Sequence, residues 1–331
     1  MILKRIQMKK SINSAKKAMV FMFTLASCFS LLQSPLYAQD STEVATETPA
    51  KTKAKPVKNT FQSVWIIDNQ TVMVPIKGTL EMDIQHRFGT VEKGYDDFWG
   101  FFAPSNIRLG VSYSPVNRLN LGIGITKRNM LWDASAKYAL ITQTPHRFPV
   151  SVSYYANIAY DTRKDEDNSI FKYRSQRISY FHQLLIARKV TDKFSIQVAP
   201  SLSHQNWVNG YYTKNDSTGT DIYKEMKFDH LAIAFSGRYK LTNVTSFMIN
   251  YDQPLTRHAN NNPNPNLSFG FEMNTSSHSF QIFMGNFFNL NPQQNNLYNN
   301  NNPFRYTDYD GTKAKGGEFV IGFNITRLWN Y

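Results

Sequence analysis

The stretch that decides the fold is Phe319 to Tyr331, FVIGFNITRLWNY, at the end of the chain. Its odd positions carry large apolar or aromatic side chains, apart from Arg327, and its even positions are mostly small or polar. A repeat of two places alternate side chains on opposite faces of a β-strand. A last strand with one apolar, aromatic face and an aromatic final residue is typical of the closing strand of an outer-membrane β-barrel. The edge strand of a soluble sandwich is the alternative.

Eleven upstream segments show the same kind of alternation, at lengths that match a tilted membrane crossing of about nine to eleven residues. They centre on residues 80–85, 107–113, 119–125, 132–140, 150–158, 174–188, 194–202, 231–239, 247–251, 267–273 and 280–284. Both faces of 174–188 are apolar, so its register stays open. The sequence predicts an all-β fold, an antiparallel transmembrane barrel of about 12 strands over residues 60–331, with clear strands from about residue 78. An even strand number places both termini in the periplasm.

The connections between these segments sort into two classes that alternate along the chain. Short ones lie at 115–117, 143–147, 189–193, 240–243 and 275–277, and long ones at 89–105, 161–173, 205–226, 253–266 and 287–314. Only the turn at 127–130 breaks the alternation. Short periplasmic turns opposite long extracellular loops are a property of membrane barrels, whereas a sandwich has no reason to sort its loops in this way.

The first 38 residues have the pattern of a secretory signal peptide. Six basic residues precede an apolar run from Ala18 to Leu32, and small residues lead to a cleavage site after Ala38. Cys28 follows Leu25-Ala26-Ser27, which is similar to a lipoprotein processing site, but the apolar run continues past it and favours ordinary cleavage. Residues 39–59, rich in Thr, Ala, Lys and Pro, are expected to form a flexible periplasmic lead.

Composition agrees with a membrane barrel and excludes several other classes. The chain has 18 Tyr and 24 Phe, and a mean hydropathy of -0.43, which suits strands that face lipid on one side only. Removing the signal takes away six of 37 basic residues and none of 24 acidic ones, which lowers the formal charge from +13 to about +7. No basic cluster that would bind nucleic acid remains beyond the lead. The body has no cysteine, so disulfides are excluded there.

Several short motifs in residues 60–160 point to a family. They are His86-Arg87-Phe88-Gly89, Phe98-Trp99-Gly100, Asn106-Ile107-Arg108, Tyr113, and Lys137-Tyr138 before Gln143. With these motifs the chain resembles an uncharacterised outer-membrane β-barrel family of Bacteroidota, classed only as a β-barrel domain of unknown function. The resemblance implies a barrel in the outer membrane and brings no substrate, catalytic residue or cofactor.

The residues that could carry chemistry do not form a recognisable catalytic or metal-binding pattern. Seven histidines are scattered without metal-ligand spacing, and none has the partners of a barrel phospholipase or protease. His86 and His230 are better interpreted as interfacial or luminal hydrogen-bonding groups. The Asn-rich loop 286–314 combines amides with aromatic rings that could stack on sugars, or it is a solvated connection. Asp308, Asp310 and Gly311 match only part of a calcium loop. We predict no enzyme, metal or cofactor.

Charged residues on the predicted inward face suggest how the lumen is built. They are nearly balanced in sign and fall on neighbouring strands, whereas a selective pore carries one dominant sign. We expect them to form a salt-bridge network that braces the wall: Glu81, Asp83, Arg87, Arg108, Asp133, Lys137 and Glu318. Arg118, Arg238 and Glu272 add scattered charges elsewhere.

Three function classes remain. The first is a narrow, passive route for a small solute, and the second a structural barrel that binds a partner of the cell envelope. An outer-membrane enzyme is the third. Residues 60–77 fit either a short strand or a segment inserted into the barrel mouth, and the pattern does not decide between them. Membrane lipid is the expected surrounding in every case.

Overall fold

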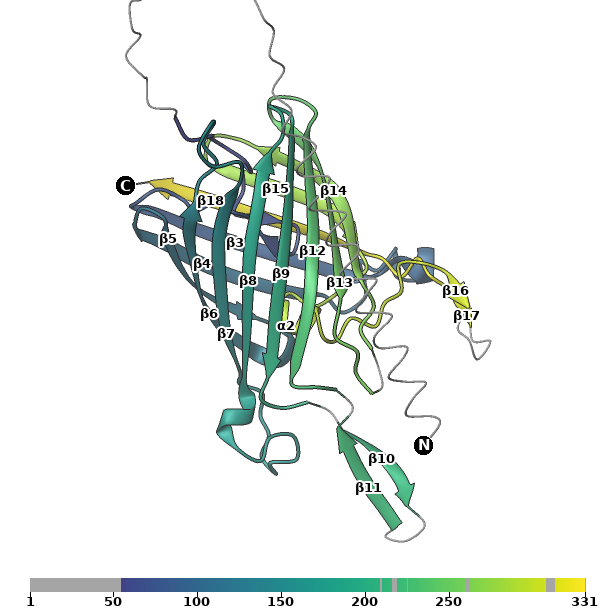
Figure 1. Ribbon diagram of the computed structural model, residues 1–331. Coiled ribbons are helices and arrows are strands. Elements are labelled where there is room, and N and C mark those ends of the chain that lie inside the picture. Colours follow the sequence, from purple (N-terminus) through teal and green to yellow (C-terminus); the bar gives the residue numbers. More distant parts are fainter. Residues whose placement is uncertain are drawn as a thin grey trace, which may run out of the picture. The chain divides into compact units, whose positions relative to one another are not determined.

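A closed antiparallel barrel of twelve strands forms the body of the computed structural model (Figure 1). The structure describes residues 55–208, 210–215, 219–224, 226–259, 262–307 and 313–330. The barrel strands follow the chain in order, and the last closes on the first. They are β3 (Thr79–Thr90), β4 (Asn106–Val116), β5 (Leu119–Thr126), β6 (Leu131–Ile141), β7 (Ser151–Asp161), β8 (Ile178–Lys189), β9 (Phe194–Gln205), β12 (Asp229–Lys240), β13 (Thr245–Pro254), β14 (Asn266–Asn274), β15 (His278–Gly285) and β18 (Val320–Asn330).

The remaining elements are short and lie outside the barrel sheet. They are the strand pairs β1 (Trp65–Ile66) with β2 (Asn69–Gln70), β10 (Gly210–Asn215) with β11 (Gly219–Lys224) and β16 (Tyr306–Thr307) with β17 (Lys313–Ala314), the 3-10 turns η2 (Val91–Asp97), η3 (Arg128–Met130) and η4 (Arg174–Arg177), and the helix α2 (Pro292–Asn295). No helix among the described residues is long and apolar enough to span a membrane. The signal peptide, Cys28, most of the lead, Asp308, Asp310, Gly311 and Tyr331 lie outside the described residues, so the predictions about them stay predictions.

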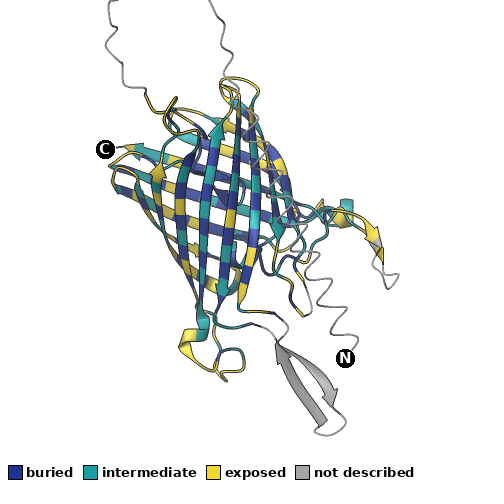
Figure 2. Ribbon diagram, in the orientation of Figure 1, coloured by how far each residue is buried: buried dark blue, intermediate teal, exposed yellow. Residues whose placement is uncertain are grey.

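The faces of the closing strand are those that the alternation predicts. Gly322, Asn324 and Thr326 are buried toward the lumen, and Phe323 and Ile325 face outward and are partly exposed. The same buried and exposed alternation runs around the barrel (Figure 2). Large apolar side chains are exposed on the outside, among them Ile123 at 63% and Trp132 at 59%. In water such a surface would be unfavourable, whereas in a bilayer it contacts lipid chains.

The two ends of the barrel carry the two classes of connection that the sequence predicts, with short turns at one end and long loops at the other. The first strand β3 pairs with β18, with Ile325 opposite Ile84, which closes the ring. The chain enters β3 and leaves β18 at the end that carries the short turns. The turn at η3, which broke the predicted alternation, is a short connection at the end with the long loops.

Strand β8, whose register stayed open in the sequence, turns Phe181, Leu185 and Ala187 into the lumen. Its apolar inward row has a partner there: these side chains form one cluster with Phe61 and Val72 of the preceding segment. An apolar inward face is therefore favourable, because protein rather than water covers it. The segment 60–77, which fitted two predictions, is both a short strand pair and an insertion into the barrel.

Candidate functional site: the lumen and the two segments inside it

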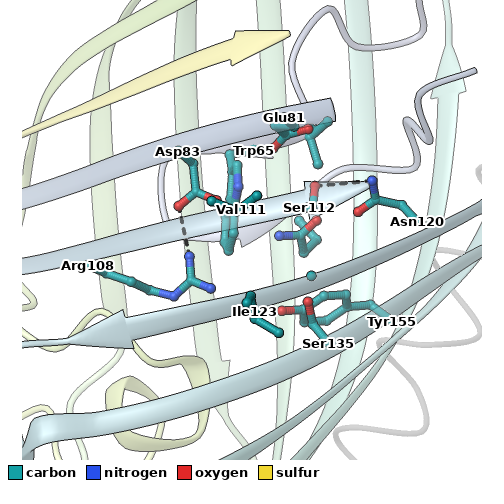
Figure 3. Close-up of a pocket in the computed structure, with 13 residues that line it drawn as sticks. Trp65, Glu81, Asp83, Arg108, Val111, Ser112, Asn120, Ile123, Ser135 and Tyr155 are labelled. Carbon is teal, nitrogen blue, oxygen red and sulfur yellow. Dashed lines mark hydrogen bonds and ion pairs between the residues drawn. The ribbon is translucent and has the colours of Figure 1, made fainter. Parts of the chain in front are cut away.

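The lumen contains an ion-pair group centred on Arg108 of β4 (Figure 3). Its Nη1 lies 2.8 Å from Asp83 Oδ2 of β3, and its Nη2 and Nε donate to the two carboxylate oxygens of Asp133 of β6 at 2.8 and 3.0 Å. Asn157 also donates to Asp133 at 3.0 Å. All three charged side chains are buried. A guanidinium bound on two sides by carboxylates is a strong, geometrically specific arrangement.

Gly124 of β5 makes this group possible. Its strand lies between Arg108 and Asp133, so the arginine must pass over the Gly124 backbone. A Cβ at position 124 would lie 2.3 Å from Arg108 Nη2 and 2.8 Å from Asp133 Oδ2. The absence of a side chain therefore opens the space in which the ion pairs form.

Glu81 and Lys137 lie in the same part of the wall but have other surroundings. Lys137 Nζ donates to Gln70 Oε1 at 2.8 Å and to the Thr71 carbonyl at 3.3 Å, so it binds the inserted segment. Glu81 makes no ion pair within 4 Å among the described residues, and its Oε2 has no hydrogen-bond partner there. A cavity of about 20 Å³ lies beside Glu81, Asp83 and Arg108, a volume near that of one water molecule.

Arg87 and Glu318 stand apart from this group. Arg87 is fully buried, donates to Asn324 Oδ1 at 2.9 Å and has its Cζ 4.4 Å from the centre of the Phe283 ring. The Glu318 carboxylate accepts a hydrogen bond from the Asn302 backbone, at the end with the long loops. The predicted set is thus divided among several places, and only Asp83, Arg108 and Asp133 are joined by ion pairs. The role of the whole set in bracing the wall remains a prediction.

A second ion pair joins two residues that the sequence suggested only as scattered charges. Arg238 Nε of β12 lies 2.6 Å from Glu272 Oε2 of β14, and both side chains are buried. Gln281 donates to Glu272 as well, at 3.2 Å. Their inward positions and opposite charges are visible in the sequence and are compatible with an ion pair. However, β13 separates their two strands, so a search for opposite charges on adjacent strands does not pair them.

The first inserted segment, residues 60–73, is held through its backbone and also through side chains such as Asn69, which donates to Asp252. Wall side chains from different strands reach its peptide groups, and amides provide most of these contacts. The Ile67 N–H donates to Gln281 Oε1, and the Ile67 carbonyl accepts from Asn324. The Val72 N–H donates to Gln197 Oε1, and the Val72 carbonyl accepts from Ser153. The Trp65 carbonyl accepts from Gln281, and the Gln70 carbonyl accepts from Gln197. Buried peptide groups without partners are costly, so these wall residues form a receptor for this backbone.

The second inserted segment is the first half of the Asn-rich loop, residues 286–302 with helix α2. Gln293 of α2 donates to Asn157 of β7 at 2.9 Å, and Asn299 donates to Asn266 of β14 at 2.7 Å. Six of its asparagines are buried: Asn286, Asn289, Asn291, Asn295, Asn296 and Asn299. The interpretation of this half as a solvated connection is therefore wrong, because its amides replace water as partners of the wall.

The two segments meet in the lumen, where Asn295 Nδ2 donates to Asp68 Oδ2 at 3.0 Å. Side chains that line an open, water-filled lumen would be exposed, but Gln85, Gln197, Asn250 and Ser268 expose at most 1% of their surface. Cavities lie beyond the segments at either end. One of about 480 Å³ includes Gln62 and the short turns, and one of about 400 Å³ includes Arg128 and Arg177 at the opposite end. The segments close the lumen between them.

The two histidines that the sequence singled out lie on opposite faces of the barrel wall, His230 inward and His86 outward. His230 of β12 is fully buried, and its Nδ1 lies 2.9 Å from His258 Nε2 of the loop that follows β13. His86 stacks on Phe323 with ring centres 5.0 Å apart. Within the part of the chain that the structure describes, no group of three or more His, Cys, Asp or Glu side chains is placed to hold a metal ion.

Comparisons with known proteins identify a family model and distant structural likenesses. A model described as "Membrane bound beta barrel domain (DUF5777)" matches residues 61–329. A 78-residue segment, 22% of this chain, is 33% identical to the uncharacterized protein YCL049C of Saccharomyces cerevisiae (strain ATCC 204508 / S288c). The match spans 25% of that relative, so the chain corresponds to only a quarter of its length.

Among solved structures, the COG4313 outer membrane channel from Pseudomonas putida F1 is 10% identical, with 78% of this chain and 97% of that chain covered and a TM-score of 0.40. The KdgM porin is 9% identical, with 76% and 99% covered and a TM-score of 0.39. Both are distant likenesses.

Proposed function

The chain belongs to the family of membrane-bound β-barrel domains, and we propose that it is a non-catalytic outer-membrane barrel with a gated, narrow passage for small polar solutes. The family model covers nearly the whole described body. The proposed state of this structure is the closed one. Opening requires residues 60–73, residues 286–302 or both to leave the lumen.

One observation carries this proposal: a lumen with a largely polar wall is closed by segments that bind it mostly through side-chain amides. Each such hydrogen bond contributes only about 0.5–1.5 kcal/mol net, because water can replace either partner. Displacement of a segment would therefore leave a wall that water can solvate. An apolar wall sealed by apolar packing would not become a polar route in this way.

Orientation follows from the two classes of loops. We place the short turns, the start of β3 and the end of β18 in the periplasm, and the long loops outside the cell. The inserted segment 60–73 then enters from the periplasmic side, and the Asn-rich loop enters from the outside. The origin of the family in Bacteroidota is a prediction from the motifs.

Conductance of the purified barrel in planar bilayers tests the passage. Deletion of residues 61–73 should raise the conductance above that of the intact protein. A milder variant, Gln197→Ala with Gln281→Ala, removes two wall amides that hold this segment and should raise the frequency of openings. Gln253→Ala, an outward-facing glutamine of β13, is the matched control and should leave conductance unchanged.

The competing proposal is a structural, partner-binding barrel whose lumen never opens. The apolar cluster of Phe61, Ile67 and Val72 with Phe181 and Leu185 favours it, because burial of these side chains makes release of the segment more costly. Folded variants, recognised by their heat-modifiable migration on gels, that conduct no better than the intact protein would contradict the passage and support this alternative.

A further inference from the structure

A cavity of about 400 Å³ at the end with the long loops has an excess of positive charge. Three of its lining residues are arginines, Arg128, Arg163 and Arg177, and one is a carboxylate, Asp161. Inward-facing wall residues such as Ser179 and Gln205 also line it, so the cavity belongs to the barrel mouth and not to the lipid surface. A solute that entered the barrel from this end would meet this surface first.

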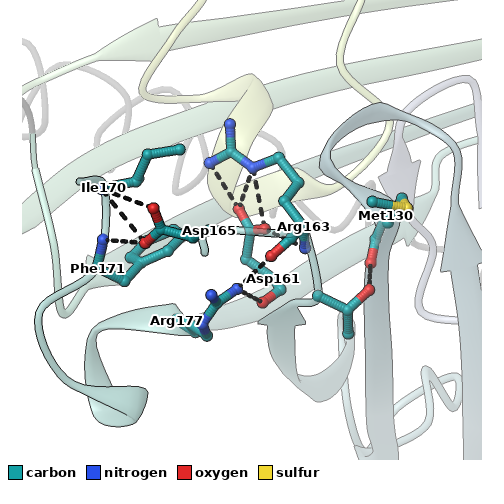
Figure 4. A network of polar contacts seen from close by, with 8 residues as sticks. Met130, Asp161, Arg163, Asp165, Ile170, Phe171 and Arg177 are labelled. Atoms are coloured by element: carbon teal, nitrogen blue, oxygen red, sulfur yellow. Dashed lines mark hydrogen bonds and ion pairs between the residues drawn. The ribbon is translucent and has the colours of Figure 1, made fainter. Parts of the chain in front are cut away.

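Asp161 does not neutralise the three arginines. Arg163 binds it with Nη2 2.8 Å from Oδ2 and with Nε 3.0 Å from Oδ1 (Figure 4). Arg177 donates to the carbonyls of Asp161 and Arg163 at 3.0 and 2.8 Å, and Arg128 has no ion pair among the described residues. Two guanidinium charges therefore remain without a carboxylate partner.

Phe171 and Asp165 hold the arginines in place. The buried Phe171 ring has Arg177 Cζ 4.7 Å and Arg163 Cζ 5.6 Å from its centre. Asp165 accepts hydrogen bonds from the backbone N–H groups of Phe171, at 2.7 Å, and Ile170 (Figure 4). These bonds lower the pKa of Asp165, the Phe171 bond most of all. The loop thus presents its guanidinium groups in a defined arrangement.

Arg128 is fixed by different contacts on the η3 turn. Its backbone N–H donates to Asn106 Oδ1 at 3.1 Å, and its Cζ lies 5.5 Å from the centre of the Phe288 ring. Burial and then the charge of Arg163 lower the pKa of Arg128, as expected for two like charges that line one cavity. An anion between them would relieve the repulsion and bind through charge-assisted hydrogen bonds.

We propose that this cavity is a binding site for a small anionic solute that carries a carboxylate or a phosphate. The remaining lining groups, with the amides of Gln176, Gln205 and Gln294 and the ring of Trp207, suit a hydroxylated body such as a sugar ring. At about 400 Å³ the cavity lies in the size range of small-molecule sites, roughly 300–1,000 Å³. This inference rests on the proposed passage, for which the cavity would be the entry site.

Calorimetric titration of the folded, detergent-solubilised full chain with glucuronate, inorganic phosphate and glucose tests the site. The closed barrel is sufficient for this measurement, so a failed passage does not affect it. Both anions should bind and glucose should not, and added salt should weaken binding. Tighter binding of glucuronate than of phosphate would assign the site to sugar acids, and the reverse to phosphate-bearing solutes.

Arg128→Gln removes a guanidinium that makes no hydrogen bond with the described residues, so it should weaken anion binding roughly tenfold or more while the barrel stays folded. Lys127→Gln, which removes one charge at the adjacent exposed position outside the cavity lining, is the control and should bind as the unmodified protein does. Equal binding of glucose and glucuronate, no binding of either anion, or equal weakening by both variants would overturn the site.

Discussion

Asn324 of the closing strand donates a hydrogen bond to the carbonyl of Ile67, with 2.6 Å between Nδ2 and the oxygen. Ile67 has a φ of 59°, a left-handed backbone that β-branched residues rarely adopt. Such a conformation costs about 1–3 kcal/mol and persists only where the surroundings hold it. Here the wall holds both peptide groups, since the Ile67 N–H donates to Gln281 Oε1. The closing strand therefore fixes the tip of the inserted hairpin.

Asn324→Ala should release this hairpin. The change leaves the buried Ile67 carbonyl without its donor and removes a partner of Arg87, so the free energy of unfolding should fall by about 1–3 kcal/mol. Brief openings should also become more frequent in single-channel records. Thr326→Ala, at the next inward position of β18, is the control. Unchanged stability and unchanged openings would show that the hairpin is held elsewhere.

Arg108→Ala tests the predicted charge network. It leaves the buried carboxylates of Asp83 and Asp133 without their cation, so the free energy of unfolding should fall by about 3–5 kcal/mol, measured as lost heat-resistance of the folded band on gels. Ion selectivity should change little. Arg188→Ala, which removes an outward-facing arginine of β8, serves as the control. An unchanged band together with a shifted reversal potential would mean that the charges select ions instead.

Gly124→Ala probes the same group without removing a charge. The added methyl would meet Arg108 Nη2 at 2.3 Å, so the ion pair must shift, at a cost of about 1–3 kcal/mol in unfolding free energy. At Gly237 of β12 the nearest atom to an added Cβ, Ile249 Cγ2, is 3.2 Å away. Gly237→Ala is therefore the control. Denaturant titration should show a clearly larger loss of unfolding free energy for Gly124→Ala than for Gly237→Ala, and equal losses would contradict the close approach.

Asp165 should hold its loop only while it is ionised. Because its pKa in the folded protein is lowered, the stabilisation is present above the ordinary pKa of 3.8 and is lost as the pH falls through the lowered value. Hydrogen-exchange protection of the Ile170 and Phe171 amides, corrected for intrinsic rates, should follow this course. Asp165→Asn should reduce the protection at neutral pH, and Asp167→Asn, which removes an exposed charge nearby, should not. Protection that is independent of pH would contradict the assignment.

Epitope tags test the orientation of the barrel. Tags at Asp165 and Asn300, and at Thr218 outside the described residues, should react with antibody on intact cells. Tags at Asp192 and Asn243, in the short turns, should react only after permeabilisation. If only the short turns reacted on intact cells, the orientation of the barrel would be the opposite of the one proposed. Reaction of both sets would contradict a membrane-spanning fold.

Much of the barrel could be predicted because its rule is local. The repeat of two along Phe319–Tyr331 decides that Phe323 faces outward and Asn324 inward, and the same rule places Asp83, Arg108 and Asp133 on the luminal face. Strand order then brings their strands near one another. Arg108 reaches both Asp83 and Asp133 only because Gly124 has no side chain in the space between them. The glycine is visible in the sequence, but the sequence alone does not indicate this role.

The contents of the lumen were decided only by the tertiary structure. Residues 60–73 and 286–302 have no clear period, because many of their peptide groups are bonded to wall side chains far away in sequence, such as Gln197 and Gln205, and not to a strand of the barrel sheet. For the same reason Lys137 binds Gln70 and Thr71, which belong to the inserted segment. Alternation determines which face a side chain occupies, but which group it meets there depends on how the chain fills the enclosed space.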